Sequence, residues 1–374
     1  MNFGNALIYT EDFKFVKGGF SVENGRFTAV GEEKDGAVDL GGRRVIPGLV
    51  DVHTHGNSGV DFSDGDYEGN IKMARYEAHN GVTSFAPATL TLPYDVLEKA
   101  FAAGLRVKKE APKGAARLVG ANMEGPYFSE KKKGAQNAAY LKKPDFEGFK
   151  KLYDGSEGLI RIVDVAPELE GAADFIERAS ELCTVSIAHT DCGYEEAVSA
   201  IGAGATQLTH LFNAMPSIHH RRPGPIGAGS ENEKVRAELI CDGLHVHPSS
   251  VRMAFKLFGA ERIVLVSDSL RCCGMPDGEY EIGGQMAFLS DCVARLSDGT
   301  IAGSASNLYM CMKKAIAFGI RAEDAVRAAA YNPACAIHAE NEIGSIAVGK
   351  LADFVVCDDG FELEEVYIGG ERIR

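Results

Sequence analysis

The middle of the chain repeats a pattern in which a short apolar run precedes an amphipathic segment. The runs of strand length are residues 48–55, 82–87, 117–124, 159–167, 184–189, 206–211, 235–241 and 262–268. Apolar positions recur at helical spacing between most of them, as from Val96 to Leu105. A further helix is predicted to begin at Pro248 and to end before Gly259. Eight strand–helix units in succession predict a (β/α)8 barrel.

The two ends of the chain have a different pattern, with short apolar strands and tight turns. The predicted strands there are residues 6–9, 19–22, 26–30, 353–357 and 365–368. Neither end carries enough apolar surface to fold well alone, so we expect the two to pair. We therefore predict a small β-sandwich domain from residues 1–47 and 340–374, and a hydrolase barrel over 48–339. A β-hairpin is expected between Glu279 and Gly303, before helices at 307–318 and 322–337.

Composition and charge restrict the class of protein. With 39 Lys and Arg against 53 Asp and Glu, the net charge of −14 is opposite in sign to that of a nonspecific nucleic-acid binder. No apolar run is long enough to span a bilayer, and residues 1–15 do not read as a secretory signal. Nine cysteines without regular spacing favour reduced thiols over a disulfide framework. We expect a cytoplasmic protein without nucleic-acid or membrane partners.

Polar residues stand at the ends of five of the eight predicted strands. They are His53 and His55 after the first strand, Glu124 after the third, His189 after the fifth, His210 after the sixth and Asp268 after the eighth. Because barrel enzymes carry their catalytic groups at the carboxyl ends of the strands, these side chains should converge on one rim. Imidazole nitrogens and carboxylate oxygens together are typical ligands of a divalent metal.

His53 and His55 are two residues apart in a strand, so both side chains point to one side and can reach one ion. Asp268 has a second possible role, because a carboxylate beside an activated water can accept its proton and later deliver it to a leaving group. A metal lowers the pKa of bound water and polarises a carbonyl. This set of residues indicates hydrolysis of an amide or a related C–N bond.

A dense positive cluster follows His210, where the sequence reads His219-His220-Arg221-Arg222. Arginine suits bidentate recognition of phosphate, and a loop asparagine such as Asn213 can bind sugar hydroxyls. His245 lies beyond the seventh strand and is a further candidate for contact with a ligand. Taken without its neighbours, the cluster is equally well explained as a solvated basic loop.

These motifs resemble those of the amidohydrolase superfamily, and within it the deacetylases of N-acetylglucosamine 6-phosphate. The resemblance runs over essentially the whole chain. The matching segments are Pro47–Gly56, Met123–Pro126, Lys133–Gln136, Thr209–Met215, Asp242–Val246 and Ser267–Asp268. The resemblance implies hydrolysis of N-acetyl-D-glucosamine 6-phosphate to D-glucosamine 6-phosphate and acetate, in amino-sugar catabolism or cell-wall recycling.

The resemblance also assigns roles to residues of this chain. Glu124, His189 and His210 would hold the principal metal ion. Asp268 would be the general base and then the general acid, and a possible metal ligand. Asn213, the Ala214 backbone, Arg221 and His245 would bind the phosphorylated sugar, with His245 reaching it across a subunit interface. Family members are dimers or tetramers and use a divalent metal, zinc or iron foremost, with one or two ions per subunit.

Two departures from the family pattern bear on the chemistry. Some members lack the His-x-His pair and use one metal, whereas His53 and His55 are both present here, which favours the capacity for a second ion. Some members carry a histidine where this chain has Gln136. A glutamine amide can donate a hydrogen bond to the acetyl carbonyl but carries neither proton nor charge, so this contact would be weaker.

Other readings stay open at this point. N-acetylgalactosamine 6-phosphate differs from the first substrate in one hydroxyl, and the sequence does not separate the two. Cyclic amidases such as dihydroorotase, and adenine deaminases, share the barrel; the former bridge their metals with a modified lysine near the fourth strand, where this chain has Val165–Glu168. A non-catalytic scaffold is less consistent with a complete set of metal ligands.

Overall fold

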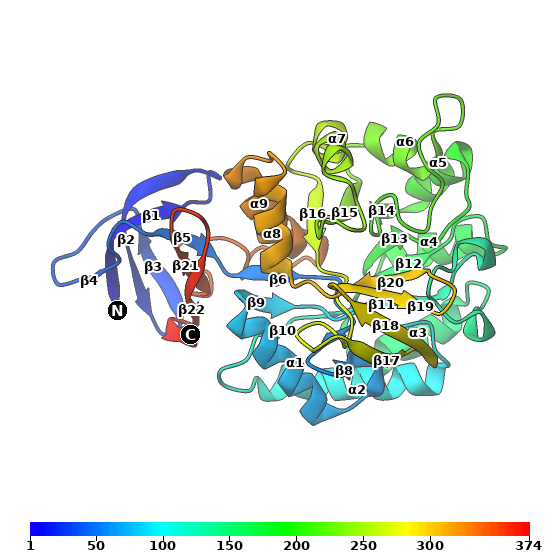
Figure 1. The fold of residues 1–374 in the computed structure, drawn as a ribbon, viewed down its shortest axis with the longest axis horizontal. Helices are drawn as coiled ribbons and strands as arrows, with labels where there is room; N and C mark the ends of the chain where they lie inside the picture. Colours follow the sequence, from blue (N-terminus) through cyan, green and yellow to red (C-terminus); the bar gives the residue numbers. More distant parts are fainter.

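The computed structural model describes residues 1–374. Figure 1 shows a lobe of strands that carries both chain termini, beside a larger lobe in which strands and helices alternate. The parallel strands of the larger lobe are β6 (Leu49–Asp51), β9 (Val82–Phe85), β10 (Arg117–Leu118), β11 (Ala121–Tyr127), β12 (Ile160–Val165), β13 (Thr184–Ile187), β14 (Ala205–Leu208), β15 (Arg236–Ile240) and β16 (Ile263–Val266). All eight predicted barrel strands are present, the third of them as the consecutive pieces β10 and β11.

The barrel strands fall into two parallel sheets, β10-β9-β6 and β11-β12-β13-β14-β15-β16. Backbone hydrogen bonds join them at both seams. The amide of Asn122 donates to the Pro87 carbonyl at 2.9 Å, and the amide of Asp268 donates to the His53 carbonyl at 2.8 Å. The second contact brings the end of the last strand beside the end of the first, as a closed α/β barrel requires.

Helices cover the outside of the barrel. They are α1 (Tyr67–His79), α2 (Tyr94–Glu110), α3 (Phe146–Gly155), α4 (Ala172–Ser180), α5 (Tyr194–Ala203), α6 (Gly224–Glu231), α7 (Pro248–Phe258), α8 (Leu308–Ala317), α9 (Ala322–Ala329) and α10 (Tyr331–Ala336). The predicted helix from Pro248 is confirmed at both ends, because Gly259 follows it with a positive φ of 72°. The single helix predicted over 322–337 is two helices, which a break at Ala330 separates.

The chain termini form one eight-stranded sheet. Its strands are β1 (Asn2–Tyr9), β2 (Phe15–Glu23), β3 (Arg26–Val30), β4 (Val38–Asp39), β5 (Arg44–Pro47), β21 (Phe354–Cys357), β22 (Leu363–Ile368) and β23 (Glu371–Arg372). The sheet curls over its own core, since the rings of Phe20 on β2 and Phe354 on β21 lie 5.0 Å apart although two strands separate β2 from β21. The two ends therefore pair as predicted, in one curled sheet; the domain boundaries at 47 and 340 stay a prediction.

An antiparallel sheet is inserted between the last barrel strand and α8. It has four strands, β17 (Gly278–Ile282), β18 (Gln285–Ser290), β19 (Val293–Leu296) and β20 (Ile301–Ser304), where the sequence predicted one hairpin. Side-chain amides tie it to the loop after β11, because Asn137 donates to the Gly283 carbonyl and Gln285 to the Ala135 carbonyl. The insertion thereby covers part of the barrel mouth.

Short elements complete the chain. They are β7 (Gly56–Asn57), β8 (Val60–Asp61), and the 3-10 turns η1 (Phe62–Asp64), η2 (Glu130–Lys132) and η3 (Ala138–Tyr140). None of the helices combines the length and the apolar character needed to cross a membrane. All nine cysteines are free thiols.

Candidate metal centre

Glu124, which lies within β11 and not at its end, is surrounded by four imidazoles. Its Oε1 is 3.2 Å from Nε2 of both His189 and His210, and its Oε2 is 3.3 Å from Nε2 of His55. Nε2 of His53 is 3.5 Å from Oε1 of Glu124. The donor atoms form two groups that share Glu124, one with His53 and His55 and the other with His189 and His210. The predicted convergence on one rim is confirmed.

Hydrogen bonds fix the orientation of two of these imidazoles. Nδ1 of His189 donates to the backbone carbonyl of Lys132 at 2.9 Å, and Nδ1 of His53 donates to the carboxylate of Glu238 at 2.8 Å. In both rings Nε2 therefore faces the centre, and it is the nitrogen that would bind a divalent ion in place of a proton. Nε2 of His53 is buried and has no hydrogen-bond partner. A divalent ion fits this arrangement, because it supplies the partner that a buried lone pair otherwise lacks.

The backbone is strained at three of the site residues. His189, His210 and Asp268 have φ values of 43°, 29° and 47°, in the left-handed region that residues with a side chain rarely adopt. Each directly or closely follows a barrel strand, so the chain turns sharply where its side chain must point inward. Such strain, of order 1–3 kcal/mol per residue, is typical of functional sites that the surrounding structure holds in place.

Asp268 faces the first group of donors. Its Oδ1 is 3.3 Å from Nε2 of His55 and 3.7 Å from Nε2 of His53. Burial alone would raise the pKa of Asp268, but the hydrogen bond from His55 and the neighbouring charge of His53 hold that pKa below its ordinary value. The side chain is therefore a carboxylate at neutral pH, the form in which it can accept a proton.

The same interactions act on the other charged groups. Burial by itself would lower the pKa of His55, but hydrogen bonds to Asp268 and Glu124 outweigh it and raise this pKa to about 10. Burial would raise the pKa of Glu124, but the charge of His53 and hydrogen bonds from His189 and His210 hold it well below its ordinary value. The carboxylates of this centre are thus ionised at neutral pH and draw protons to the facing imidazoles, and a bound cation would take the place of those protons.

Gln136 contacts the centre through Glu124. Its Nε2 donates to Oε2 of Glu124 at 2.6 Å, and its Oε1 accepts from the backbone amide of Thr91 at 2.8 Å. The amide is thus held at both ends, with one N–H directed at the shared carboxylate. A second N–H of the same amide remains for another acceptor.

Four of the predicted substrate-binding residues line the cavity beside the metal-binding groups, which has a volume of about 200 Å³: Gln136, Asn213, Ala214 and His245. Nδ1 of His245 donates to Asp242 at 2.6 Å, which leaves its Nε2 free. The backbone amide of Ala214 has no acceptor within the protein. The Ala214 amide can therefore donate a hydrogen bond to a ligand, and Nε2 of His245 can donate one when the imidazole is charged or accept one when it is neutral.

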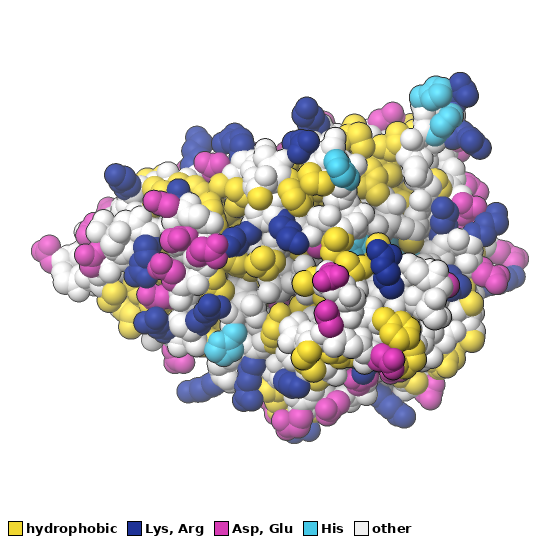
Figure 2. All heavy atoms as spheres, in the orientation of Figure 1, with side chains coloured by type: hydrophobic (Ala, Val, Ile, Leu, Met, Phe, Trp, Pro, Cys, Tyr) yellow, Lys and Arg dark blue, Asp and Glu magenta, His cyan; other side chains and the backbone are white.

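Arg221 does not line this cavity. It lies with His219 and Arg222 around a separate surface hollow next to Asp191 and Tyr194. Figure 2 shows histidine and basic side chains gathered on a projection beyond α5 and α6 of Figure 1. No lysine or arginine lines the metal-site cavity. The anion-binding group predicted in this loop is thus not part of the cavity within a single chain.

Sequence reasoning missed Glu238. This fully buried residue lies on β15 and accepts from His53 at one carboxylate oxygen and from Gln207 at the other, at 2.7 Å. The only signal was an acidic residue inside the mostly apolar run Val235–Cys241, which also holds Arg236. Since an unpaired buried charge is costly, such a residue implies a buried partner, but the sequence does not say which one.

The chain was compared with known proteins. The family model "Amidohydrolase family" matches residues 44–373. N-acetylglucosamine-6-phosphate deacetylase of Vibrio furnissii is 34% identical over 94% of this chain and 89% of its own length. N-acetylgalactosamine-6-phosphate deacetylase of Escherichia coli O157:H7 is 32% identical over 87% of both chains.

Solved structures give the same result. A mutant of N-acetyl-D-glucosamine-6-phosphate deacetylase from Mycobacterium smegmatis, in complex with N-acetyl-D-glucosamine-6-phosphate, superposes with a TM-score of 0.94. It is 31% identical, and the match covers 100% of this chain and 99% of that one. The chain therefore belongs to the amidohydrolase family, and within it to the N-acetylglucosamine-6-phosphate deacetylases.

Proposed function

We propose that the protein hydrolyses N-acetyl-D-glucosamine 6-phosphate to D-glucosamine 6-phosphate and acetate. The observation that carries this proposal is the group of four imidazoles around Glu124 with the Asp268 carboxylate beside them, at the mouth of a barrel whose relatives are sugar-phosphate deacetylases. Such a set suits the hydrolysis of an amide. Water, the weak nucleophile, must be deprotonated, and the amine, a poor leaving group, must be protonated.

We assign separate steps of the reaction to residues of this chain. When bound, a divalent ion supplies a Lewis acid that acidifies water and polarises the acetyl carbonyl. Asp268 accepts the proton of the attacking water as the C–O bond forms, and then delivers it to the sugar nitrogen as the C–N bond breaks. Gln136 donates its second N–H to the acetyl oxygen in this proposal, which the contact of its first N–H with Glu124 supports.

The assignment of ions is part of the proposal. Glu124, His189 and His210 would hold the principal ion, and His53 and His55 with Glu124 a second one, with Asp268 as a further ligand. Zinc or iron suits an imidazole and carboxylate set without thiolate. Elemental analysis of the purified protein would identify the metal and count the ions per chain.

The phosphate of the substrate needs a cation that the metal-site cavity of one chain lacks. We propose that Arg221 supplies it, and that the protein is a dimer or tetramer in which this loop reaches the cavity of a second copy. The exposure of His220 and Arg221 on a projecting loop supports this arrangement. We also propose a cytoplasmic location, which nine free thiols support.

The test is release of acetate from N-acetylglucosamine 6-phosphate and from the sugar without phosphate, each before and after chelation and metal restoration. Metal-dependent release from the phosphorylated sugar is the expected result. Equal release from both sugars would contradict the anion site at Arg221 but leave the deacetylase. No release by protein that contains metal would contradict the proposed reaction.

N-acetylgalactosamine 6-phosphate is the second candidate substrate, because a relative named for that activity is 32% identical to this chain. The two sugars differ only in the orientation of one hydroxyl. Comparing kcat/KM for both sugars in the same assay decides between them, and a preference of tenfold or more for the galacto sugar would replace the first assignment.

A further inference from the structure

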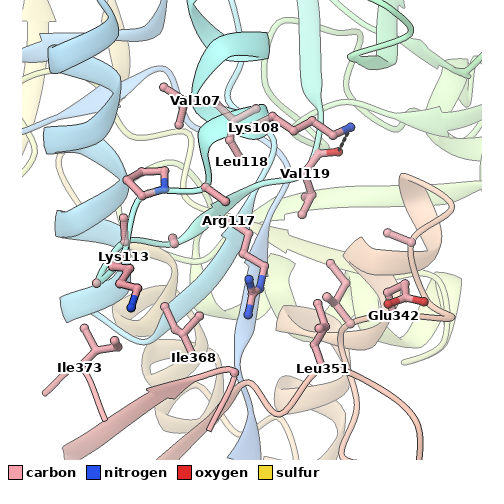
Figure 3. A pocket seen from close by; sticks show the side chains of 18 of the residues that line it. Val107, Lys108, Lys113, Arg117, Leu118, Val119, Glu342, Leu351, Ile368 and Ile373 are labelled. Carbon is pink, nitrogen blue, oxygen red and sulfur yellow. Dashed lines mark hydrogen bonds between the residues drawn. The ribbon is translucent and has the colours of Figure 1, made fainter. Parts of the chain in front are cut away.

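A second large cavity lies at the junction of the barrel with the terminal sheet. It has a volume of about 610 Å³ and is lined by the end of α2 and the loop after it, the starts of β10 and β12, residues 338–351 and the last strands of the chain. Figure 3 shows Lys108, Lys113 and Arg117 among the side chains around it. It opens at the amino-terminal ends of the barrel strands, on the side opposite the metal centre.

Three cations of this junction cavity have no acidic partner. No carboxylate oxygen lies within 4.0 Å of the charged nitrogens of Lys108, Lys113 or Arg161. Other charges in the lining are compensated: Arg117 pairs with Asp353 at 3.2 Å, and Glu342 pairs with Arg26 at 2.8 Å. Only Glu371, which is exposed, adds a free negative charge.

Lys108 and Arg161 are both half-buried in the lining of this cavity. Burial, and secondly the charge of Arg161, lower the pKa of the Lys108 ammonium. Lys108 donates only to the carbonyl of Val119, at 3.3 Å, and Arg161 makes no hydrogen bond to the protein. Two half-buried like charges raise the free energy of the folded state unless an anion lies between them.

The rest of the lining is apolar. Val107, Leu118 and Ile343 are buried at its floor, and Leu351, Ile368 and Ile373 are half-buried at its wall. Pockets that bind small molecules combine such a surface with a few polar groups, and they are found preferentially at the junctions of domains. Residues at the amino-terminal face of a barrel usually contribute to stability. An open cavity lined by unpaired cations does not stabilise the fold, so stability does not explain it.

We propose that the junction cavity binds a small organic anion in which a phosphate or carboxylate is joined to an apolar ring or chain. The oxyanion lies beside Lys108 and Arg161, the two half-buried cations of the lining, and the apolar part contacts Leu118, Ile343 and Leu351. Because its walls come from both the barrel and the terminal sheet, the bound anion holds these two parts together. The proposal is independent of the reaction at the metal centre.

The test uses 4-fluorophenyl phosphate, 4-fluorobenzoate and inorganic phosphate as probes of the full-length protein. Binding is followed by fluorine NMR for the first two probes and by calorimetry for all three, with D-glucosamine 6-phosphate present in excess to occupy the metal-site cavity. The variants are Arg161→Gln and Lys108→Gln, each of which removes one of the two cations beside the oxyanion and keeps most of its apolar stem. Lys109→Gln is the matched control, since Lys109 lies next to Lys108 but pairs with Glu157 outside the cavity.

We expect one or both aromatic probes to bind, and each variant to weaken that binding at least tenfold while Lys109→Gln leaves it unchanged. The stronger aromatic probe shows whether phosphate or carboxylate is preferred. Inorganic phosphate should bind at least tenfold more weakly than 4-fluorophenyl phosphate. Equal affinity of these two, equal affinity in all variants, or no binding of either aromatic probe would each overturn the proposal.

Discussion

The metal centre has two sides, one with His53 and His55 after β6 and the other with His189 and His210 after β13 and β14. They differ in the groups that the imidazoles contact besides Glu124. On the side of β6, the carboxylate of Glu238 holds His53, and the carboxylate of Asp268 faces both His53 and His55. On the side of β13 and β14, a backbone carbonyl holds His189, and no carboxylate other than Glu124 is within 4.0 Å of the His189 or His210 ring nitrogens.

This difference separates the two tasks of the site. A neutral carbonyl behind an imidazole fixes its direction without adding charge, so the β13 side offers a ligand group with one negative charge, that of Glu124. The β6 side gathers three carboxylates within reach of two histidines, which favours binding of a cation there, and one of the three is Asp268, the proposed acid and base. Variants of residues on each side, and of the shared residue, test this division.

The largest effect is expected for Glu124→Gln, which alters both sides at once. The amide cannot supply a negative oxygen to either group of donors, so metal content should fall on both sides and acetate release should drop by at least about ten-thousandfold. Elemental analysis and the acetate assay measure the two effects. Retention of a full complement of metal would contradict the placement of Glu124 as the shared ligand.

The next largest effect is expected for Asp268→Asn, which acts on the β6 side alone. An amide of the same shape keeps the fold but cannot accept a proton, so kcat should fall by about a hundredfold to ten-thousandfold. Metal at the β13 side and the melting temperature should stay near those of the unaltered protein. Near-normal turnover in this variant would remove Asp268 from its proposed role.

A smaller effect is expected for Glu238→Gln. The glutamine lacks the charge that holds the proton on Nδ1 of His53, so the affinity of the β6 side for metal should fall by about 10- to 100-fold. Competition with a chelator, followed by a metal count, measures this loss. His189 is the internal control, because its acceptor, the Lys132 carbonyl, is untouched, whereas the Glu238 carboxylate also accepts from the His210 amide at 3.3 Å. Equal loss of metal from both sides would show that Glu238 only supports the fold.

Much of this centre could be predicted from the sequence because each ligand follows an apolar strand. Side chains at the ends of parallel barrel strands must meet, so His53, Glu124 and His210 could be placed together from local pattern alone. Glu238 could not be found in this way, since its partner lies 185 positions away and only the closed barrel brings the two together. The curl of the terminal sheet and the distance of Arg221 from the metal-site cavity likewise depend on tertiary packing.

The smallest effect is expected for Asp242→Asn at the edge of the metal-site cavity. Nδ1 of His245 donates to Asp242 there, as Nδ1 of His53 donates to Glu238. Burial alone would lower the pKa of His245, but the hydrogen bond and charge of Asp242 outweigh it and raise that pKa. In Asp242→Asn the acceptor for the backbone amides of Leu244 and His245 remains while the charge is lost. The pKa of His245 should therefore fall, which an NMR titration of the imidazole measures directly.

The sign of the effect on stability follows from the same shift. A histidine whose pKa is raised by folding stabilises the folded state fully below its unfolded pKa of about 6.5, and this contribution is lost as the pH rises through the folded value. The melting temperature of Asp242→Asn should thus lie below that of the unaltered protein near pH 6, and the two should approach each other at pH 9. If the difference in melting temperature instead grew with pH, His245 would be neutral in the folded protein. Asp242 would then not stabilise a charged imidazole, and the comparison with Glu238 and His53 would fail.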